Sequence, residues 1–149
     1  MKQPFEGAKL ALYIGVRLAV ILRDDIDGIP FPGHWDMPGG GREGEEDPLS
    51  CALRETHEEL GLTIPPRAVK WGHAFDAGSK RHWLFVARVS SSVARHVVLG
   101  AEGQCWALMD EASFLTHPKA IPLQQGRLRE YLDTSATSEK PPAALSGGR

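Results

Sequence analysis

The apolar residues of this chain fall in short blocks, and the first blocks predict β-strands. Residues 9–13 and 17–23 are rich in Leu, Ile, Val and Tyr, and Gly15 lies between them. These blocks predict a hairpin or two neighbouring strands, although apolar and polar positions alternate poorly within them. Three later blocks also predict strands: 69–76, 82–89 and 105–109, the first two joined by a turn at 77–79.

One block has helical spacing instead. Five residues recur every three or four positions and define a buried stripe: Leu49, Ala52, Leu53, Thr56 and Leu60. Asp47 suits the N-cap, Pro48 the first helical position and Gly61 the left-handed residue that ends a helix. The sequence therefore predicts a helix over residues 48–60.

The remaining segments complete the predicted organisation. Gly and Pro predict a loop at 24–34, and the glycines at 39–41 predict a turn. A short helix is expected at 110–115 and a final one at 123–132, with a disordered tail over 134–149. The domain would thus span residues 1–133. Strands dominate without strict alternation, which favours an α/β sandwich with a mixed sheet.

Length, charge and cysteine content exclude only a few classes of function. At 149 residues the chain fits one domain, and its formal net charge of −2 gives no support to a role in coating nucleic acid polymers. The apolar stretch 10–22 contains Gly15 and Arg17 and is too short for a membrane span, so we expect a cytoplasmic protein with no membrane partner. Cys51 and Cys105 follow no zinc spacing and predict two free thiols, with a disulfide as the alternative.

Three glutamates stand out on the predicted helix. Glu55, Glu58 and Glu59 occupy an arc beside the buried stripe, where residues three and four apart share a face. Like charges gathered in this way repel one another unless a positive group lies among them. Several carboxylate oxygens suit a hard divalent cation, so this arc is a candidate metal site and active site.

The spacing around these glutamates resembles a known motif. Gly40 is followed after five residues by Glu46, and after seven more by Arg54-Glu55-Thr56-His57-Glu58-Glu59-Leu60-Gly61-Leu62. This resembles the Nudix box, G-x5-E-x7-R-E-U-x-E-E-x-G-U, where U is a bulky aliphatic residue. Thr56 is the one mild departure. The chain is identified as a short, MutT-like member of the Nudix hydrolase family, and the resemblance implies an α/β/α sandwich with a central mixed β-sheet.

The resemblance also implies roles for the box residues. Glu58 and Glu59 would bind Mg²⁺ or Mn²⁺, and Glu55 would be a further ligand or the base that activates water. The Gly40 backbone carbonyl would also coordinate the metal. Arg54 would hold a glutamate in place, with a simple helix-surface ion pair to Glu58 as the alternative.

Two further residues have open roles. Glu46 is expected to support the junction between the loop and the helix. Glu102 precedes the strand predicted at 105–109, where some Nudix pyrophosphohydrolases carry a glutamate that reaches the metals. It is therefore either catalytic or an ordinary loop acid.

The resemblance implies hydrolysis of a phosphoanhydride in a nucleoside diphosphate linked to another moiety. The short single domain favours a nucleoside or deoxynucleoside triphosphate as the small-molecule substrate. ADP-ribose or another nucleotide derivative is the alternative, and a non-catalytic nucleotide-binding regulatory module is a second one. In the MutT-like group that the chain resembles, an asparagine that reads an oxidised guanine would fall near Ala120, just before Pro122; no amide is there, which disfavours 8-oxo-dGTP. Nudix domains often form dimers, so a homodimer is a further expectation.

Overall fold

The structure is a computed structural model that describes residues 4–139. Its strands are β1 (Gly7–Ile14), β2 (Arg17–Leu22), β3 (Trp35–Asp36), β4 (Gly39–Gly41), β5 (Val69–Ala77), β6 (Lys80–Val89) and β7 (Cys105–Met109). Its helices are α1 (Pro48–Leu60), α2 (Glu111–Thr116) and α3 (Pro122–Glu139), with 3₁₀ turns at η1 (Pro66–Ala68) and η2 (Ser91–His96). The expected strands and helices are present, most with ends within two residues of the prediction.

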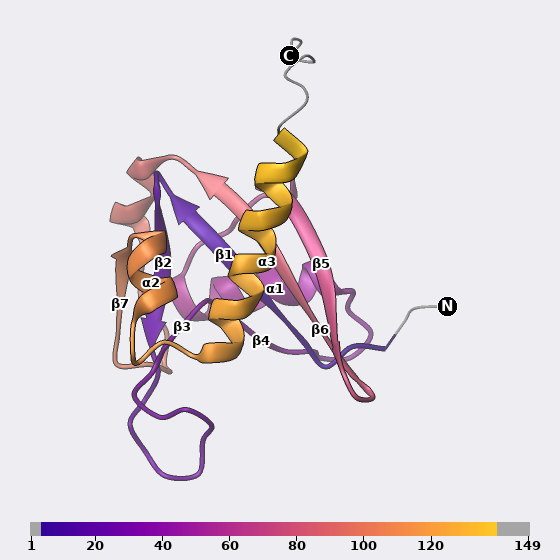
Figure 1. Cartoon of the computed structure of the whole chain (residues 1–149). Coiled ribbons are helices and arrows are strands. Elements are labelled where there is room, and N and C mark those ends of the chain that lie inside the picture. The colour runs from indigo at the N-terminus through magenta and orange to yellow at the C-terminus, as the bar shows by residue number, and fades with distance from the viewer. Residues whose placement is uncertain (1–3, 140–149) are drawn as a thin grey trace.

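The strands form one mixed sheet (Figure 1). The order along it is β3-β2-β1-β6-β5, with β4 paired to β1 and β7 paired to β2. Strands β1 and β6 run parallel along their whole shared length, whereas the other pairs are antiparallel. Gly15, with a φ of 69°, closes the predicted hairpin between β1 and β2.

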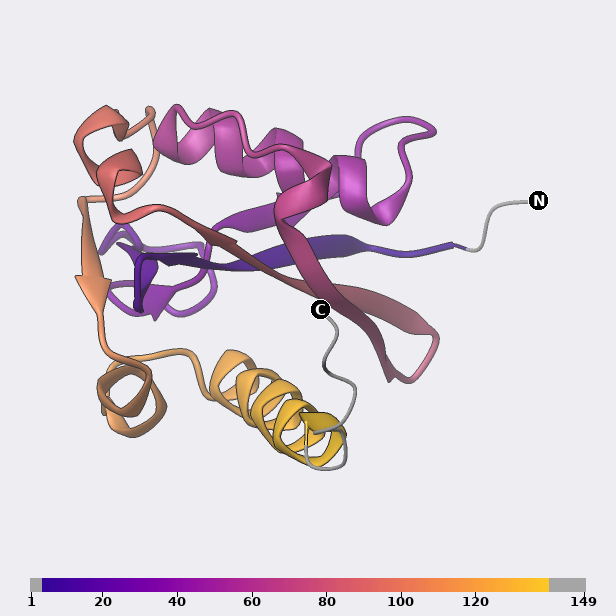
Figure 2. The ribbon, with the colours of Figure 1, turned by 90° about the horizontal axis from the view of Figure 1, so that it is seen from above.

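Helices cover both faces of this sheet. Helix α1 lies on one face, and α2 and α3 lie on the other (Figure 2). Alternate residues of β1 enter two separate cores: Leu10 and Leu12 pack on the α1 side, whereas Ala11 and Tyr13 pack on the α3 side. A strand buried on both faces needs no polar alternation, which explains the poor alternation in the sequence. The expected α/β/α sandwich is confirmed.

The glycine segment is a strand rather than the predicted turn. Gly39–Gly41 forms β4, antiparallel to β1, with Ala8 opposite Gly40. A Cβ atom on Gly39 would lie 2.3 Å from the Ala8 carbonyl oxygen, and its φ of 136° is unfavourable for other residues. The glycines therefore let the backbone lie directly against β1.

The last helix is longer than predicted. Helix α3 continues to Glu139, because residues 133–139 contain no Gly or Pro that would end it. The tail predicted to begin at residue 134 is therefore wrong for 134–139, and residues 140–149 lie outside the described residues. The domain boundary at 133 remains a prediction.

Two smaller expectations concern the cysteines and the membrane. Cys51 is buried, Cys105 is exposed and both are free thiols, as predicted. Within residues 4–139, no helix combines the length and apolar character needed to cross a bilayer.

Candidate active site

Helix α1 presents the glutamates because its ends and its stripe are fixed as the sequence predicts. The Asp47 carboxylate accepts the Ser50 N–H at 2.8 Å, and Gly61 ends the helix with a φ of 68°. Thr56 is fully buried, and its hydroxyl donates to the Ala52 carbonyl at 2.8 Å. The one departure in the box is thus a satisfied core residue, which leaves the glutamates on the adjoining arc.

Arg54 is the positive group among these acids. Its Nε and Nη2 atoms donate to the two carboxylate oxygens of Glu46 at 3.0 and 2.9 Å, a bidentate pair. Its Nη1 atom lies 3.2 Å from Glu55 and 3.0 Å from Glu58, and Nη2 also donates to the Gly41 carbonyl at 2.9 Å. One guanidinium thereby connects α1 to β4 and to the loop between β4 and α1, which carries Glu46.

This network resolves part of the charge repulsion that the sequence predicts. The hydrogen bonds from Arg54 lower the pKa of Glu46 to about 2, and the Glu46 carboxylate in turn raises the pKa of Arg54. Arg54 both connects α1 to the preceding loop and strand and contacts two expected metal ligands, Glu55 and Glu58. The two interpretations of its role are therefore compatible.

The negative charges of Glu55 and Glu59 are less well compensated. Both side chains lie against the β4 backbone, where burial disfavours a charged carboxylate. Glu59 accepts the Gly39 N–H at 2.9 Å, and burial raises the pKa of Glu59 to about 7. Burial also raises the pKa of Glu55. A Cβ atom on Gly40 would lie 2.6 Å from the Glu55 carboxyl carbon, so the glycine forms the cradle in which this carboxyl group rests.

A second charged cluster, which sequence reasoning missed, adjoins Glu59. Asp36 is only 4% exposed, and its carboxylate lies 2.8 Å from Lys9 Nζ and 3.5 Å from Arg23 Nη1. Lys9 also donates to the Gly39 carbonyl at 3.1 Å. The one available signal was Lys9 itself, because a charge inside an apolar strand requires a buried partner.

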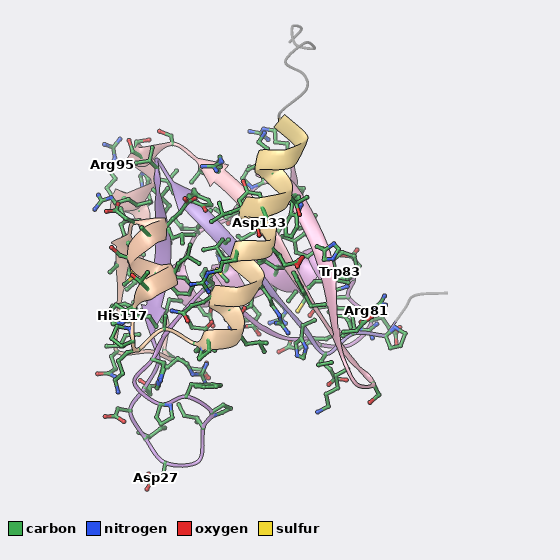
Figure 3. All side chains as sticks on the ribbon, in the orientation of Figure 1. Asp27, Arg81, Trp83, Arg95, His117 and Asp133 are labelled. Carbon is green, nitrogen blue, oxygen red and sulfur yellow. The ribbon has the colours of Figure 1, made fainter. Side chains whose placement is uncertain are left out.

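Two cavities meet at this cluster and share Arg23, Pro30 and Asp36. One, of about 290 Å³, is lined by both Glu59 and Glu102, so this loop acid and the helix contribute to the same cavity. The other, of about 430 Å³, reaches from Lys9 and Gly40 towards α3. The loop that carries Asp27 at its tip extends beside them, away from the sandwich (Figure 3).

The carboxylates of α1 are engaged with protein groups. Within the described part of the chain, no group of three or more His, Cys, Asp or Glu side chains is already arranged around one metal position. Arg54 holds Glu55 and Glu58, and the Gly39 N–H holds Glu59. The chemistry of the donors nevertheless fits, because burial destabilises the negative charge of Glu55 and Glu59, and a cation would reverse that effect.

Comparison with known proteins agrees with the motif. A model described as "NUDIX domain" matches residues 16–131. Mouse diphosphoinositol polyphosphate phosphohydrolase 2 is 28% identical over 97 residues, covering 48% of this chain and 54% of that protein. The chain thus spans about half the length of this curated relative.

Solved structures share the fold. A MutT protein from Methanosarcina mazei Go1 superposes with a TM-score of 0.69 at 17% identity, covering 91% of this chain and 98% of that one. A C. elegans Ap4A hydrolase superposes with a TM-score of 0.68 at 20% identity, covering 89% and 99%. These likenesses show the fold, and the NUDIX match extends over most of the chain. The chain therefore belongs to the Nudix hydrolase family.

Proposed function

We propose that this chain is a metal-dependent pyrophosphohydrolase that cleaves a phosphoanhydride bond in a nucleoside triphosphate. The observation that carries the proposal is the arc of Glu55, Glu58 and Glu59 on α1, two of them desolvated beside the β4 backbone. Family membership supports hydrolysis as the reaction class. The Arg54 network supports the idea that the arc is held in a fixed geometry.

The roles of the residues follow from their positions. Glu58 and Glu59 would bind the ion, together with a carbonyl oxygen of Gly40 or of the adjoining Gly39. Glu55 would bind it as well or accept the proton of the attacking water, a role that its raised pKa suits. A bound Mg²⁺ or Mn²⁺ would supply positive charge to the pyrophosphate group.

Three more side chains complete the proposed site. Lys9 and Arg23 line the cavities next to Glu59 and would bind phosphate oxygens. Glu102 lines the smaller cavity together with Glu59 and is proposed as an additional catalytic carboxylate. Arg54 acts as a positioning residue, because it touches the carboxylates rather than the cavity.

The cavities favour a nucleotide over the highly charged substrate named for the curated relatives. A diphosphoinositol polyphosphate requires many cations, whereas the cationic side chains lining the two described cavities are Lys9, Arg23 and Arg127. Asp36 already pairs with two of them. The aromatic side chain of Phe31 lines the larger cavity instead, as a nucleobase would need.

A substrate panel tests this proposal. Purified protein with Mg²⁺ would be incubated with nucleoside triphosphates, ADP-ribose, dinucleoside polyphosphates and a diphosphoinositol polyphosphate, and the products separated by anion-exchange chromatography. We expect kcat/KM for a nucleoside triphosphate to exceed that for the inositol substrate by about tenfold or more. Preference for the inositol substrate would contradict the assignment. Tight nucleotide binding with no product would instead support the regulatory-module alternative.

A further inference from the structure

Two residues that line the larger cavity carry buried polar atoms without hydrogen-bond partners in the described part of the chain. Gln124 is 7% exposed, and its Oε1 atom makes no hydrogen bond with any described residue. His82, on β6, likewise has a buried Nδ1 atom without a partner. Both residues line the cavity. Buried polar atoms are almost always hydrogen-bonded in proteins, so these two require an explanation.

Arg127 adds an unpaired charge to the same cavity. It is 6% exposed and makes no hydrogen bond or ion pair with the described residues, while its guanidinium lies 5.3 Å from the centre of the Phe75 ring. Burial lowers the pKa of Arg127. The guanidinium therefore has N–H donors available for the acceptors of a ligand.

The neighbouring amide on α3 shows what a structural glutamine looks like here. Gln125 donates from Nε2 to the carbonyls of Phe114 and His117, at 2.9 and 3.0 Å. These bonds fix α3 against α2. Gln124, one residue earlier, lines the cavity, and its Oε1 atom accepts no hydrogen bond from the described residues. The Gln125 amide therefore has a structural role, whereas the Gln124 carbonyl oxygen is available to a ligand.

From these observations we propose that the larger cavity binds the nucleobase of the substrate, with Arg127 donating to a ring acceptor and Gln124 accepting from a ring N–H or amino group. A nucleobase carries both kinds of group on one planar edge, whereas a phosphate offers acceptors only and would leave Gln124 unsatisfied. Phe31 contributes an aromatic side chain to the lining, whereas the Trp83 ring stacks on Phe85 and packs in the core beside α1. The cavity volume of about 430 Å³ falls in the usual range for small-molecule sites.

This inference rests on the proposed function, because the larger cavity is also lined by Lys9, which we propose binds phosphate oxygens, and by its partner Asp36. The test of base binding uses neither metal nor hydrolysis, so that the inference and the proposed function can fail separately. Isothermal titration calorimetry in EDTA would compare the four nucleoside 5′-monophosphates with ribose 5-phosphate, which lacks the base. We expect at least one nucleotide to bind about tenfold tighter than ribose 5-phosphate.

Two pairs of variants separate recognition from structure. Gln124→Met and Arg127→Met should each reduce nucleotide affinity about tenfold and leave ribose 5-phosphate binding unchanged. Both should preserve Tm, because neither removes a side-chain hydrogen bond with a described residue, and Gln124→Met also removes an unsatisfied acceptor. The matched controls, Gln125→Met and Arg129→Met, should leave nucleotide affinity unchanged. Gln125→Met should lower Tm, since it removes two hydrogen bonds.

Equal affinity for nucleotides and ribose 5-phosphate would overturn the inference, and so would unchanged nucleotide affinity in both cavity variants. A lowered Tm in Gln124→Met would also count against it, because that result would assign the amide a structural role. Hydrolysis in the substrate panel can still succeed in each case, which would leave the proposed function intact.

Discussion

A Glu59→Gln variant is expected to lose activity on the order of 10²–10³-fold in kcat while becoming more stable than the parent at alkaline pH. The activity falls because an amide carries no charge to bind the divalent ion. Stability rises because burial of the Glu59 carboxylate is unfavourable in the metal-free protein, where its pKa is raised to about 7. Gln retains an oxygen that can accept the Gly39 N–H, so the backbone contact survives.

The pH dependence of this gain has a definite sign. A carboxyl group whose folded pKa exceeds its unfolded value lowers stability progressively as pH rises between the two values. The unfolded value for Glu is 4.5 and the folded value about 7. The stability difference between Glu59→Gln and the parent should be near zero at pH 4 and about 1–3 kcal/mol at pH 8.

Urea denaturation in EDTA at several pH values measures this difference, with Glu130→Gln as the control on the exposed face of α3. The control should match the parent in both activity and stability. A Glu59→Gln variant with full activity would exclude Glu59 from the metal site. One that is destabilised at pH 8 would contradict the proposed desolvation of its carboxylate.

Replacing Arg54 with Met should give the largest loss of stability among the charged positions of the site. The change leaves Glu46, Glu55 and Glu58 without their shared cation and removes the bond to the Gly41 carbonyl. Breaking a partly buried pair in this way should lower the free energy of unfolding by about 2–4 kcal/mol. Activity should fall as well, because Glu55 and Glu58 lose their fixed positions.

The matched control is Arg81→Met, which breaks an exposed ion pair with Asp76 at 2.7 Å. Its loss should stay within about 1 kcal/mol. Equal effects of the two substitutions, measured by urea denaturation at pH 7, would show that the Arg54 network is no more than a surface contact. Arg54→Lys should recover only part of the loss, since an ammonium group cannot pair bidentately with Glu46.

The parts of the site that the sequence predicts well are those formed by local contacts. Asp47, Thr56, Gly61 and the glutamate arc all belong to α1 or its caps, so helical spacing alone places them. The cluster of Lys9 and Asp36 joins residues 27 positions apart, and its formation depends on how β2 pairs with both β1 and β3. No local pattern carries that information.

The glycine segment and the base cavity were missed for related reasons. Glycines predict a turn by local preference, but here their lack of side chains allows β4 to lie against β1 and beneath Glu55. Gln124 and Arg127 lie on α3, whose cavity-facing residues become apparent only after the helix packs beside β1 and β6. The long final helix likewise reflects the absence of a breaker rather than any positive signal.

Direct binding of Mn²⁺ tests the central claim, that the glutamates of α1 form a divalent-metal site. Electron paramagnetic resonance would measure free Mn²⁺ during titration of the parent, Glu58→Gln and Glu130→Gln. We expect the parent and the Glu130 control to bind Mn²⁺ alike, and Glu58→Gln to bind it about tenfold more weakly or worse. Equal Mn²⁺ affinity in all three proteins would contradict the account.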